Sequence, residues 1–129
     1  MTPSAKTRAL LLFAHGSSDP RWAEPFVKLQ SVIRQHDPAQ IVELAYLERM
    51  KPSFDEAVAT LQAQGVQQIT VAPIFLALGG HMRKDLPDLV HAAQQRTGID
   101  FQVLPALGEA EMLIESIATW VCSASASQD

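Results

Sequence analysis

Four short apolar runs alternate with amphipathic stretches along this chain, and the alternation restricts the possible folds more than any other feature of the sequence. The runs occupy residues 8–14, 41–47, 68–75 and 101–104, lengths that suit strands and are too short for core helices. Apolar residues recur at helical spacing in the segments after the runs. Strands that alternate with helices predict a parallel sheet covered on both faces, because the crossover connections are right-handed.

The length of 129 residues suits one domain with a single core. We predict one α/β domain over residues 1–122, followed by a flexible C-terminal tail at residues 123–129. Its sheet is expected to be small, doubly wound, four-stranded and parallel, of the flavodoxin-like type, with the strand order 2-1-3-4. In that order the first and third strands are neighbours, and the connections that follow them run in opposite directions. Doubly wound sheets bind ligands at the edge between two such strands.

Proline and capping residues define the first two predicted helices. Pro25 would break a helix that began as early as Asp19, so the start of the first helix, which runs to His36, stays open; a start near Glu24 after an irregular turn fits Pro25. Ser53 and Glu56 have the spacing of a capping box, which places the start of the second helix directly after Ser53. Both helices are expected to lie on the sheet through one apolar stripe.

The last two helices are predicted in the same way. Asp85 is the expected N-cap of the third, with Pro87 in its first turn and Gly98 as its C-terminal stop. The last helix is expected over residues 109–122, because acidic residues occupy its first turn. Its predicted buried residues are Leu113, Ile114, Ile117 and Val121.

Charge and cysteine content exclude several classes of function. The net charge of −4 disfavours a protein that binds nucleic acid or an anionic membrane, since both need a cationic surface. Cys122 is the only cysteine, which excludes a disulfide framework and a cysteine-rich zinc site and suits a reducing compartment. Residues 1–8 are polar and no apolar run approaches twenty residues, so we expect a cytoplasmic protein without a secretory signal or a membrane span.

Histidines follow two of the predicted strands. His15 comes directly after the first run, and His81 follows the third run across Gly79 and Gly80. Because the carboxyl ends of parallel strands meet at one edge of a sheet, the two imidazoles are expected in loops around a common cleft. Imidazole suits divalent first-row metals and also transfers protons near neutral pH. The pair therefore predicts a metal or proton-transfer site with His15 and His81 as metal ligands.

Glu48 closes the second predicted strand at the same edge of the sheet. Its carboxylate could act as a third ligand or accept a proton. It could equally be a surface carboxylate paired with Arg49 or Lys51.

Small and basic residues near the two histidines are candidates for ligand binding. The loop after His15 offers backbone amides and hydroxyl groups, and a glycine before His81 allows the backbone to approach a ligand closely. Basic side chains, including Lys84, could form a cationic rim around the cleft. The predicted ligand-binding residues are Ser17, Ser18, Arg21, Gly80 and Arg83.

These motifs, in this order, resemble the small class II chelatases of the CbiX type, the sirohydrochlorin cobaltochelatase family. The resemblance covers nearly the whole chain. It is carried by Leu11-Leu12-Phe13-Ala14-His15-Gly16-Ser17, by Ala45-Tyr46-Leu47-Glu48 with Pro52 downstream, by Val71-Ala72-Pro73-Ile74-Phe75-Leu76 leading to Gly80-His81, and by Asp85-Leu86-Pro87.

The resemblance implies an enzyme that inserts a divalent metal into sirohydrochlorin or a similar tetrapyrrole. It implies metal-binding histidines at positions 15 and 81, an acidic assistant at Glu48, and a homodimer equivalent to the two-lobed larger chelatases. The metal, Co²⁺, Ni²⁺ or Fe²⁺ with cobalt favoured, is a substrate, and no organic cofactor is expected. Family members often carry Arg after the HGS motif, where this chain has Ser18; Arg21 is the nearest replacement for that charge.

Two other functions fit the same residues. A nonenzymatic carrier of a metal or tetrapyrrole would need the same binding groups, since binding residues alone do not prove turnover. A flavin or phosphate-ligand module would use the same point of the sheet, with the amides of the loop after His15 as donors. The metal and the pathway, whether cobalamin, sirohaem or a nickel cofactor, stay open because imidazole and carboxylate accept all of these ions.

Overall fold

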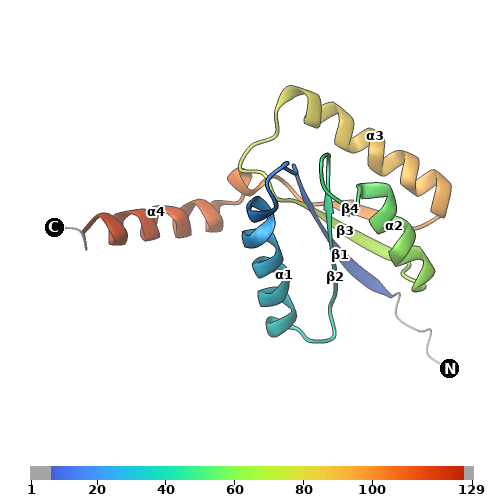
Figure 1. Ribbon diagram of the computed structural model, residues 1–129, viewed down its shortest axis with the longest axis horizontal. Coiled ribbons are helices and arrows are strands. Elements are labelled where there is room, and N and C mark those ends of the chain that lie inside the picture. The colour runs from blue at the N-terminus through green and yellow to red at the C-terminus, as the bar shows by residue number, and fades with distance from the viewer. Residues whose placement is uncertain (1–6, 127–129) are drawn as a thin grey trace.

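The four apolar runs form one parallel sheet in the computed structural model, which describes residues 7–126 (Figure 1). Its strands are β1 (Arg8–Ala14), β2 (Ile41–Tyr46), β3 (Gln68–Pro73) and β4 (Asp100–Val103). Their order is β2-β1-β3-β4, with every pairing parallel. The predicted α/β class, strand number and 2-1-3-4 order are therefore confirmed.

The apolar character of β1 follows from its central position. It pairs with β2 on one side and with β3 on the other, so that Leu11 lies opposite both Glu43 and Val71. Leu11 and Phe13 have no exposed surface, and Leu12 on the opposite face is 2% exposed. A strand covered on both faces needs apolar residues at consecutive positions, which is why this run does not alternate with polar residues.

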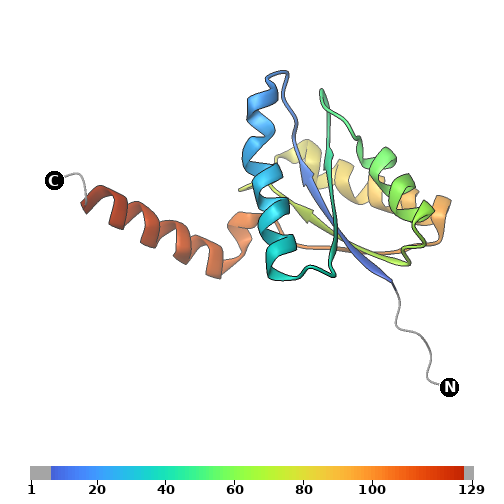
Figure 2. The same cartoon turned by 60° about the horizontal axis from the view of Figure 1, so that its bottom comes forward.

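Helices cover both faces of this sheet (Figures 1 and 2). The helix α1 (Glu24–His36) lies on one face after a short 3₁₀ turn, Pro20–Ala23, and contacts β2. The helices α2 (Phe54–Ala63) and α3 (Gly80–Thr97) lie together on the other face. The first helix starts at Glu24, as fits Pro25, and ends at His36 as predicted, and the capping box of α2 is confirmed, including reciprocal hydrogen bonds between Ser53 and Glu56.

The main core lies between the sheet and the pair α2 and α3. Phe13 on β1 packs edge-on against Phe54 at the start of α2, with ring centroids 5.4 Å apart. The apolar stripe of α2 is buried at each of its four positions, Phe54, Ala57, Val58 and Leu61. A smaller cluster on the α1 face joins Leu12 and Tyr46 of the strands to Trp22 and Phe26. No helix in residues 7–126 is long and apolar enough to cross a membrane.

The start of α3 differs from the prediction. The helix begins at Gly80 with Gly79 as its N-cap, so Asp85 and Pro87 lie inside it and His81 belongs to its first turn instead of a loop. The reason is Met82, which is 8% exposed and extends the stripe of Leu86 by one turn toward the N-terminus. The free energy gained by burying Met82 outweighs the loss of the backbone hydrogen bond that Pro87 cannot donate.

The last helix differs most from its prediction. After the 3₁₀ turn η2 (Leu107–Glu109), the helix α4 (Glu111–Ala126) includes residues 123–126, which the sequence assigned to a flexible tail; residues 127–129 lie outside the described part. None of its residues is buried, because the helix extends away from the sheet (Figures 1 and 2). The prediction that it buries four apolar residues in this chain is therefore wrong.

The capping box of α2 yields a testable stability prediction. Hydrogen bonds from the backbone amide and hydroxyl of Ser53 hold the pKa of Glu56 below its usual value. Ser53→Ala should lower the free energy of unfolding by about 1 kcal/mol, measured by urea denaturation at pH 7. Because the pKa of Glu56 is lower in the folded state, its contribution is present at neutral pH and is lost as the pH falls through that value.

The matched control is Ser31→Ala, an exposed serine within α1. Alanine favours the helix interior, so this variant should be as stable as the parent or slightly more stable. If Ser53→Ala and Ser31→Ala lowered the free energy of unfolding equally, the capping role of Ser53 would be contradicted.

Candidate metal and proton-transfer site

Backbone pairing beyond the ends of β1 and β2 positions the first histidine. The amide of Leu47 donates to the carbonyl of Ala14 at 2.9 Å, and the amide of Glu48 donates to the carbonyl of His15 at 3.1 Å. These bonds continue the parallel ladder into the two loops. His15 and Glu48 are therefore held side by side at the carboxyl edge of the sheet.

Gly16 makes this close approach possible. Its φ of +99° is a conformation that L side chains rarely adopt, and a Cβ at this position would overlap the carbonyl oxygen of Glu48. Glycine is thus required here both for backbone conformation and for space.

The side chains of His15 and Glu48 form a direct pair. The Nε2 atom of His15 lies 3.1 Å from Oε1 of Glu48, and both side chains are about half exposed, at 54% and 50%. The same oxygen lies 3.8 Å from Nε of Arg49, a looser contact in solvent. Glu48 can orient the His15 ring and accept a proton from it, whereas the exposed contact with Arg49 contributes little stability.

One cavity of about 350 Å³ brings the two predicted metal ligands together. His15 enters it from the loop after β1, and His81 enters it from the first turn of α3. The ring of Phe75 lies edge-on to His15, with centroids 6.3 Å apart, and forms part of an apolar wall. The remaining lining residues are Leu47, Ala77, Gly79, Gly80, Met82 and Asp85.

Asp85 is the site residue that sequence reasoning missed. The sequence predicts a helix N-cap at this position, but Asp85 lies within α3 four residues after His81, and both line the cavity. Residues four apart lie on one face of a helix, so the spacing of His81 and Asp85 is the feature of the sequence that places them in the same cavity. Glu48 contacts His15 but does not belong to the lining of the cavity. Within residues 7–126, no three His, Cys, Asp or Glu side chains form a ready metal cluster.

The predicted rim residues lie apart from this cavity, except Gly80. Arg21 is bound to Asp19 through its backbone amide, Nε and Nη2, at 3.0–3.3 Å, and its side chain is 83% exposed. These bonds hold the pKa of Asp19 below its usual value. The Ser17 hydroxyl accepts from the Asp19 amide, and Ser18 is exposed.

Arg83 lies on the other side of α3 from Asp85. Its Nε donates to the carbonyl of Leu78 at 3.2 Å, and it lines a separate apolar groove with Leu86, Val90 and Val103. Arg83 therefore does not line the His15 cavity.

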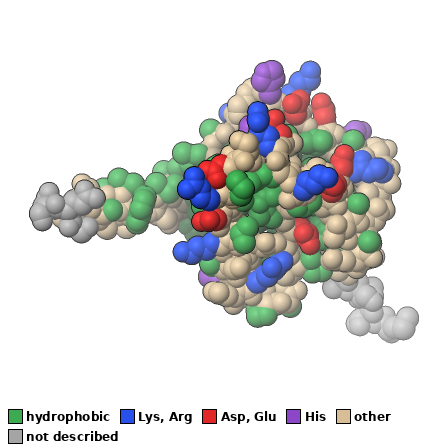
Figure 3. Space-filling view, viewed as in Figure 1, with side chains coloured by type: hydrophobic (Ala, Val, Ile, Leu, Met, Phe, Trp, Pro, Cys, Tyr) green, Lys and Arg blue, Asp and Glu red, His purple; other side chains and the backbone are tan. Residues whose placement is uncertain are grey.

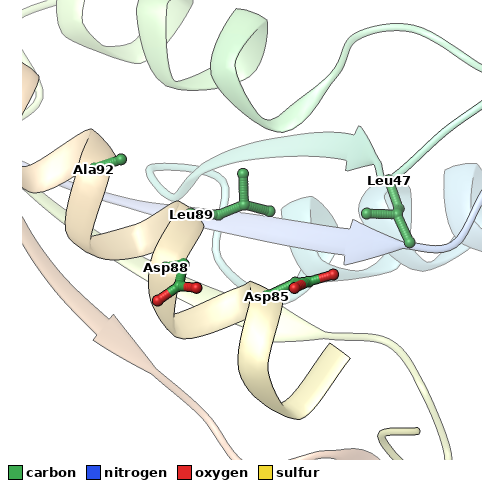
Figure 4. Close-up of a pocket in the computed structure, with 5 residues that line it drawn as sticks. All are labelled: Leu47, Asp85, Asp88, Leu89 and Ala92. Atoms are coloured by element: carbon green, nitrogen blue, oxygen red, sulfur yellow. The ribbon is translucent and has the colours of Figure 1, made fainter. Parts of the chain in front are cut away.

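A second cavity, of about 380 Å³, adjoins the first (Figure 4). It shares Leu47 and Asp85 with the His15 cavity and continues along α3 past Leu89. Figure 4 shows Leu89 and Asp85 directed from α3 toward Leu47, which lies beyond the end of β2. The two cavities together offer a broad, mainly apolar surface with Asp85 between them, which suits a flat organic ligand larger than a single metal ion.

The doubly wound four-stranded sheet, with two histidines in one cavity at its carboxyl edge, defines an α/β domain with a candidate metal site. Residues 9–124 match the CbiX family. The chain therefore belongs to the CbiX family.

Two solved structures resemble this chain over most of its length. A structure from Marinobacter aquaeolei VT8, described as a cobalamin (vitamin B12) biosynthesis CbiX protein, is 34% identical, with a TM-score of 0.83 over 95% of this chain and 99% of that one. The sirohydrochlorin chelatase SirB from Bacillus subtilis subspecies spizizenii, in complex with cobalt, is 21% identical and shares the fold, with a TM-score of 0.77. The match covers 91% of this chain and 50% of SirB.

Curated relatives are similar over a shorter stretch. The sirohydrochlorin cobaltochelatase of Saccharolobus solfataricus is 36% identical over 81 residues, 63% of this chain and 62% of that protein. The sirohydrochlorin cobaltochelatase of Methanocaldococcus jannaschii is 38% identical over 82 residues, 64% of this chain and 57% of that protein. The chain thus matches about three fifths of the length of these relatives.

The close contact at Gly16 yields a second prediction. Gly16→Ala should destabilise the fold by more than about 1 kcal/mol, because the new Cβ adds steric overlap to the strain of a positive φ. It should also separate His15 from Glu48, which NMR would detect as a changed His15 ring resonance.

Gly65→Ala is the matched control. Gly65 also has a positive φ, +81°, but a Cβ there would meet no atom within 4 Å. In this variant the free energy of unfolding should fall only by the cost of backbone strain, and the His15 ring resonance should stay unchanged. Equal destabilisation by the two substitutions would contradict the proposed overlap with Glu48.

Proposed function

We propose that this protein is a sirohydrochlorin cobaltochelatase, a lyase that inserts a divalent metal ion into sirohydrochlorin or a closely similar tetrapyrrole. The observation that carries the proposal is the placement of His15 and His81 in one open cavity of a CbiX-family chain. The two curated relatives described above carry this name. Cobalt is the favoured metal, with nickel and ferrous iron as alternatives, and the metal is a substrate.

Metal insertion needs weak metal binding and a proton acceptor in the same place. A free tetrapyrrole must lose its pyrrolic protons as the cation enters the ring. His15 and His81 supply few ligands in an open cavity, which is typical of sites where a metal is handled and not of closed structural sites. In this proposal the two imidazoles hold the ion beside the ring. As the ion passes to the ring nitrogens, one imidazole is released and accepts one of the two pyrrolic protons, while the other proton passes to Asp85 or to solvent.

Glu48 is proposed to act through His15. Because its carboxylate lies 3.1 Å from Nε2 of His15 and outside the cavity lining, it is placed to orient the ring and to stabilise the imidazolium formed when His15 accepts a proton. Asp85 lines the cavity itself and is proposed as a further proton acceptor or transient metal ligand.

The tetrapyrrole is proposed to lie along the two adjoining cavities. Their apolar walls, including Leu47, Phe75 and Leu89, suit the faces of a macrocycle. The carboxylates at the edge of sirohydrochlorin would reach outward to Arg21, Arg83 and Lys84, with Ser17, Ser18 and Gly80 contributing hydroxyl or amide donors. No organic cofactor is required for this reaction.

We further propose that the chain acts as a cytoplasmic homodimer. It matches 50% of the length of SirB, so two copies would supply the equivalent of that longer chain. The name of the Marinobacter relative favours cobalamin synthesis as the pathway. A nonenzymatic carrier would bind the same ligands without accelerating insertion, and the assay below separates the two.

The main test compares insertion rates in the presence of protein with the spontaneous rate. Purified protein is mixed with metal-free sirohydrochlorin and Co²⁺, Ni²⁺ or Fe²⁺, and the absorbance change of the macrocycle is followed. His15→Ala and His81→Ala should each lower the catalysed rate by about 10²-fold or more, since each removes a metal ligand or proton acceptor. Tight binding of both ligands without acceleration would favour the carrier.

His36→Ala is the control for these variants. His36 ends α1, is exposed, and does not line the cavity. Its substitution should leave the insertion rate unchanged. A comparable loss in this variant would show that the effect is not specific to the site.

Glu48→Gln tests the role of the carboxylate. If Glu48 assists proton transfer through His15, the insertion rate should fall about 10-fold while the affinity for Co²⁺ changes little. Cobalt affinity is measured by titration of its visible absorption bands. A parallel loss of affinity and rate would instead make Glu48 a metal ligand.

A further inference from the structure

A groove of about 340 Å³ lies between α3 and β4, on the side of α3 away from Asp85. We call it the α3–β4 groove. Leu86 and Val90 of α3 form its apolar base, and Val103 of β4, which is 41% exposed, forms its opposite wall. Cavities of this size with mostly apolar walls are typical of small-molecule sites.

The two sides of α3 carry opposite charge. Asp85 and Asp88 line the cavity that α3 forms with Leu47 (Figure 4). Among the described residues that line the α3–β4 groove there is no carboxylate, although the chain as a whole has a net charge of −4. The groove residues of α3 follow one another at three or four positions, with one adjacent pair, as expected for one face of a helix, and they include Arg83, Pro87, Val90, His91 and Gln94. The groove is therefore an apolar site with a cationic group on an acidic protein.

Arg83 supplies the positive charge of the groove. Its Nε atom donates to the carbonyl of Leu78 at 3.2 Å, so the backbone fixes one edge of the guanidinium. In the part of the chain that the structure describes, no carboxylate pairs with Arg83, whereas Arg21 and Arg96 each bind an aspartate. The two Nη groups of Arg83 can therefore donate to a ligand, and a guanidinium binds a carboxylate through two parallel hydrogen bonds.

The free edge of β4 does not favour a peptide as the occupant of the groove. Among the described strands, β4 pairs with β3 alone, so its outer edge is open. The strand has four residues, and Pro105 follows one residue after its end. An added strand needs a row of backbone groups to pair with, and a short edge strand offers few of them. A small molecule that packs on Val90 and Val103 needs no such row.

Sirohydrochlorin does not match the apolar part of the groove. Carboxylates surround its ring, and burying them against Leu86 and Val90 would cost free energy because they would lose water without gaining a partner. The groove offers one guanidinium, so it suits a ligand that has one carboxylate and is otherwise apolar. Arg83 can still contact a carboxylate at the edge of the tetrapyrrole when the groove is empty.

We propose that the α3–β4 groove binds a small amphipathic carboxylate, with its carboxylate on the Nη groups of Arg83 and its apolar body on Leu86, Val90 and Val103. Arg83 and Gln94 are eleven residues apart along α3, or about 16 Å, so the groove accepts an extended chain. The proposal concerns a second ligand of the protein and does not depend on the proposed function.

The groove and the His15 cavity lie on two sides of one turn. Leu78 and Arg83 line the groove, while the residues between them, Gly79 to Met82, line the His15 cavity. A ligand in the groove would thus contact the turn that carries His81 without entering the cavity that His81 lines.

The first test titrates the metal-free full chain with decanoate and follows the methyl resonances of Val90 and Val103 by NMR. Both sets should shift and saturate together. Decanol and decylammonium have the same chain length but no carboxylate, so each should bind about 10-fold more weakly or worse. Equal affinity for decanoate and decanol would overturn the proposal, because the groove would then be an apolar surface only.

Variants at the charged and apolar parts of the groove form the second test. Arg83→Gln should weaken decanoate binding about 10-fold, since it removes the charge-assisted hydrogen bonds. Val103→Asp should abolish binding by repelling the carboxylate. The matched control is Arg96→Gln, because Arg96 belongs to the same helix but binds Asp55 and does not line the groove. Unchanged affinity in Arg83→Gln would refute the assignment.

The helix α4 provides an internal control for nonspecific binding. Figure 3 shows hydrophobic side chains along its length, and Val121 is 50% exposed. An apolar chain that adheres to any hydrophobic surface would shift the methyl resonances of Val121 as much as those of Val103. The Val121 resonances should instead stay in place, and equal shifts would contradict a defined site in the groove.

A final titration separates this ligand from the tetrapyrrole. Metal-free sirohydrochlorin should leave the Val90 methyl resonances in place, because its ring is proposed to lie on the other side of α3. If it shifted them as decanoate does, the groove would belong to the tetrapyrrole and the proposal would fail. Decanoate binding in a protein that does not accelerate metal insertion would refute the chelatase function and leave the groove site standing.

Discussion

The structure depends most on the backbone pairing that continues past the ends of β1 and β2. Two amide-to-carbonyl bonds, from Leu47 to Ala14 and from Glu48 to His15, extend the ladder of the buried sheet into the site. They require a glycine at position 16, because any side chain would overlap Glu48. Packing in the core therefore sets the distance between a histidine and its carboxylate, although both side chains are half exposed.

The proposed chemistry fits a rigid backbone that carries exposed imidazole side chains. His15 projects from a loop tied to the central strand, and His81 from the first turn of α3, which Met82 and Leu86 attach to the core. Neither imidazole is enclosed by a full set of ligands, so an ion bound between them keeps positions free for a macrocycle.

Much of the fold could be predicted because it depends on local patterns. The apolar runs and the capping box at Ser53 correctly predicted the four strands and the start of α2. The start of α3 was missed because Pro87 suggested a first turn, whereas burial of Met82 extended the helix upstream. The site was foreseen as a pair of histidines, but the position of Asp85 in the cavity depended on where α3 begins.

By itself, the sequence determined the class of fold and the residue types at the carboxyl edge of the sheet, since periodicity and turn chemistry act over a few neighbouring residues. Only the tertiary structure decided which carboxylate contacts His15, which residues share its cavity, and where α4 points. A stripe such as that of Leu113, Ile117 and Val121 shows that a helix has an apolar face. It cannot show that this face is left away from the chain's own sheet, because the direction of α4 depends on the hydrogen bonds of the turn at Gly108.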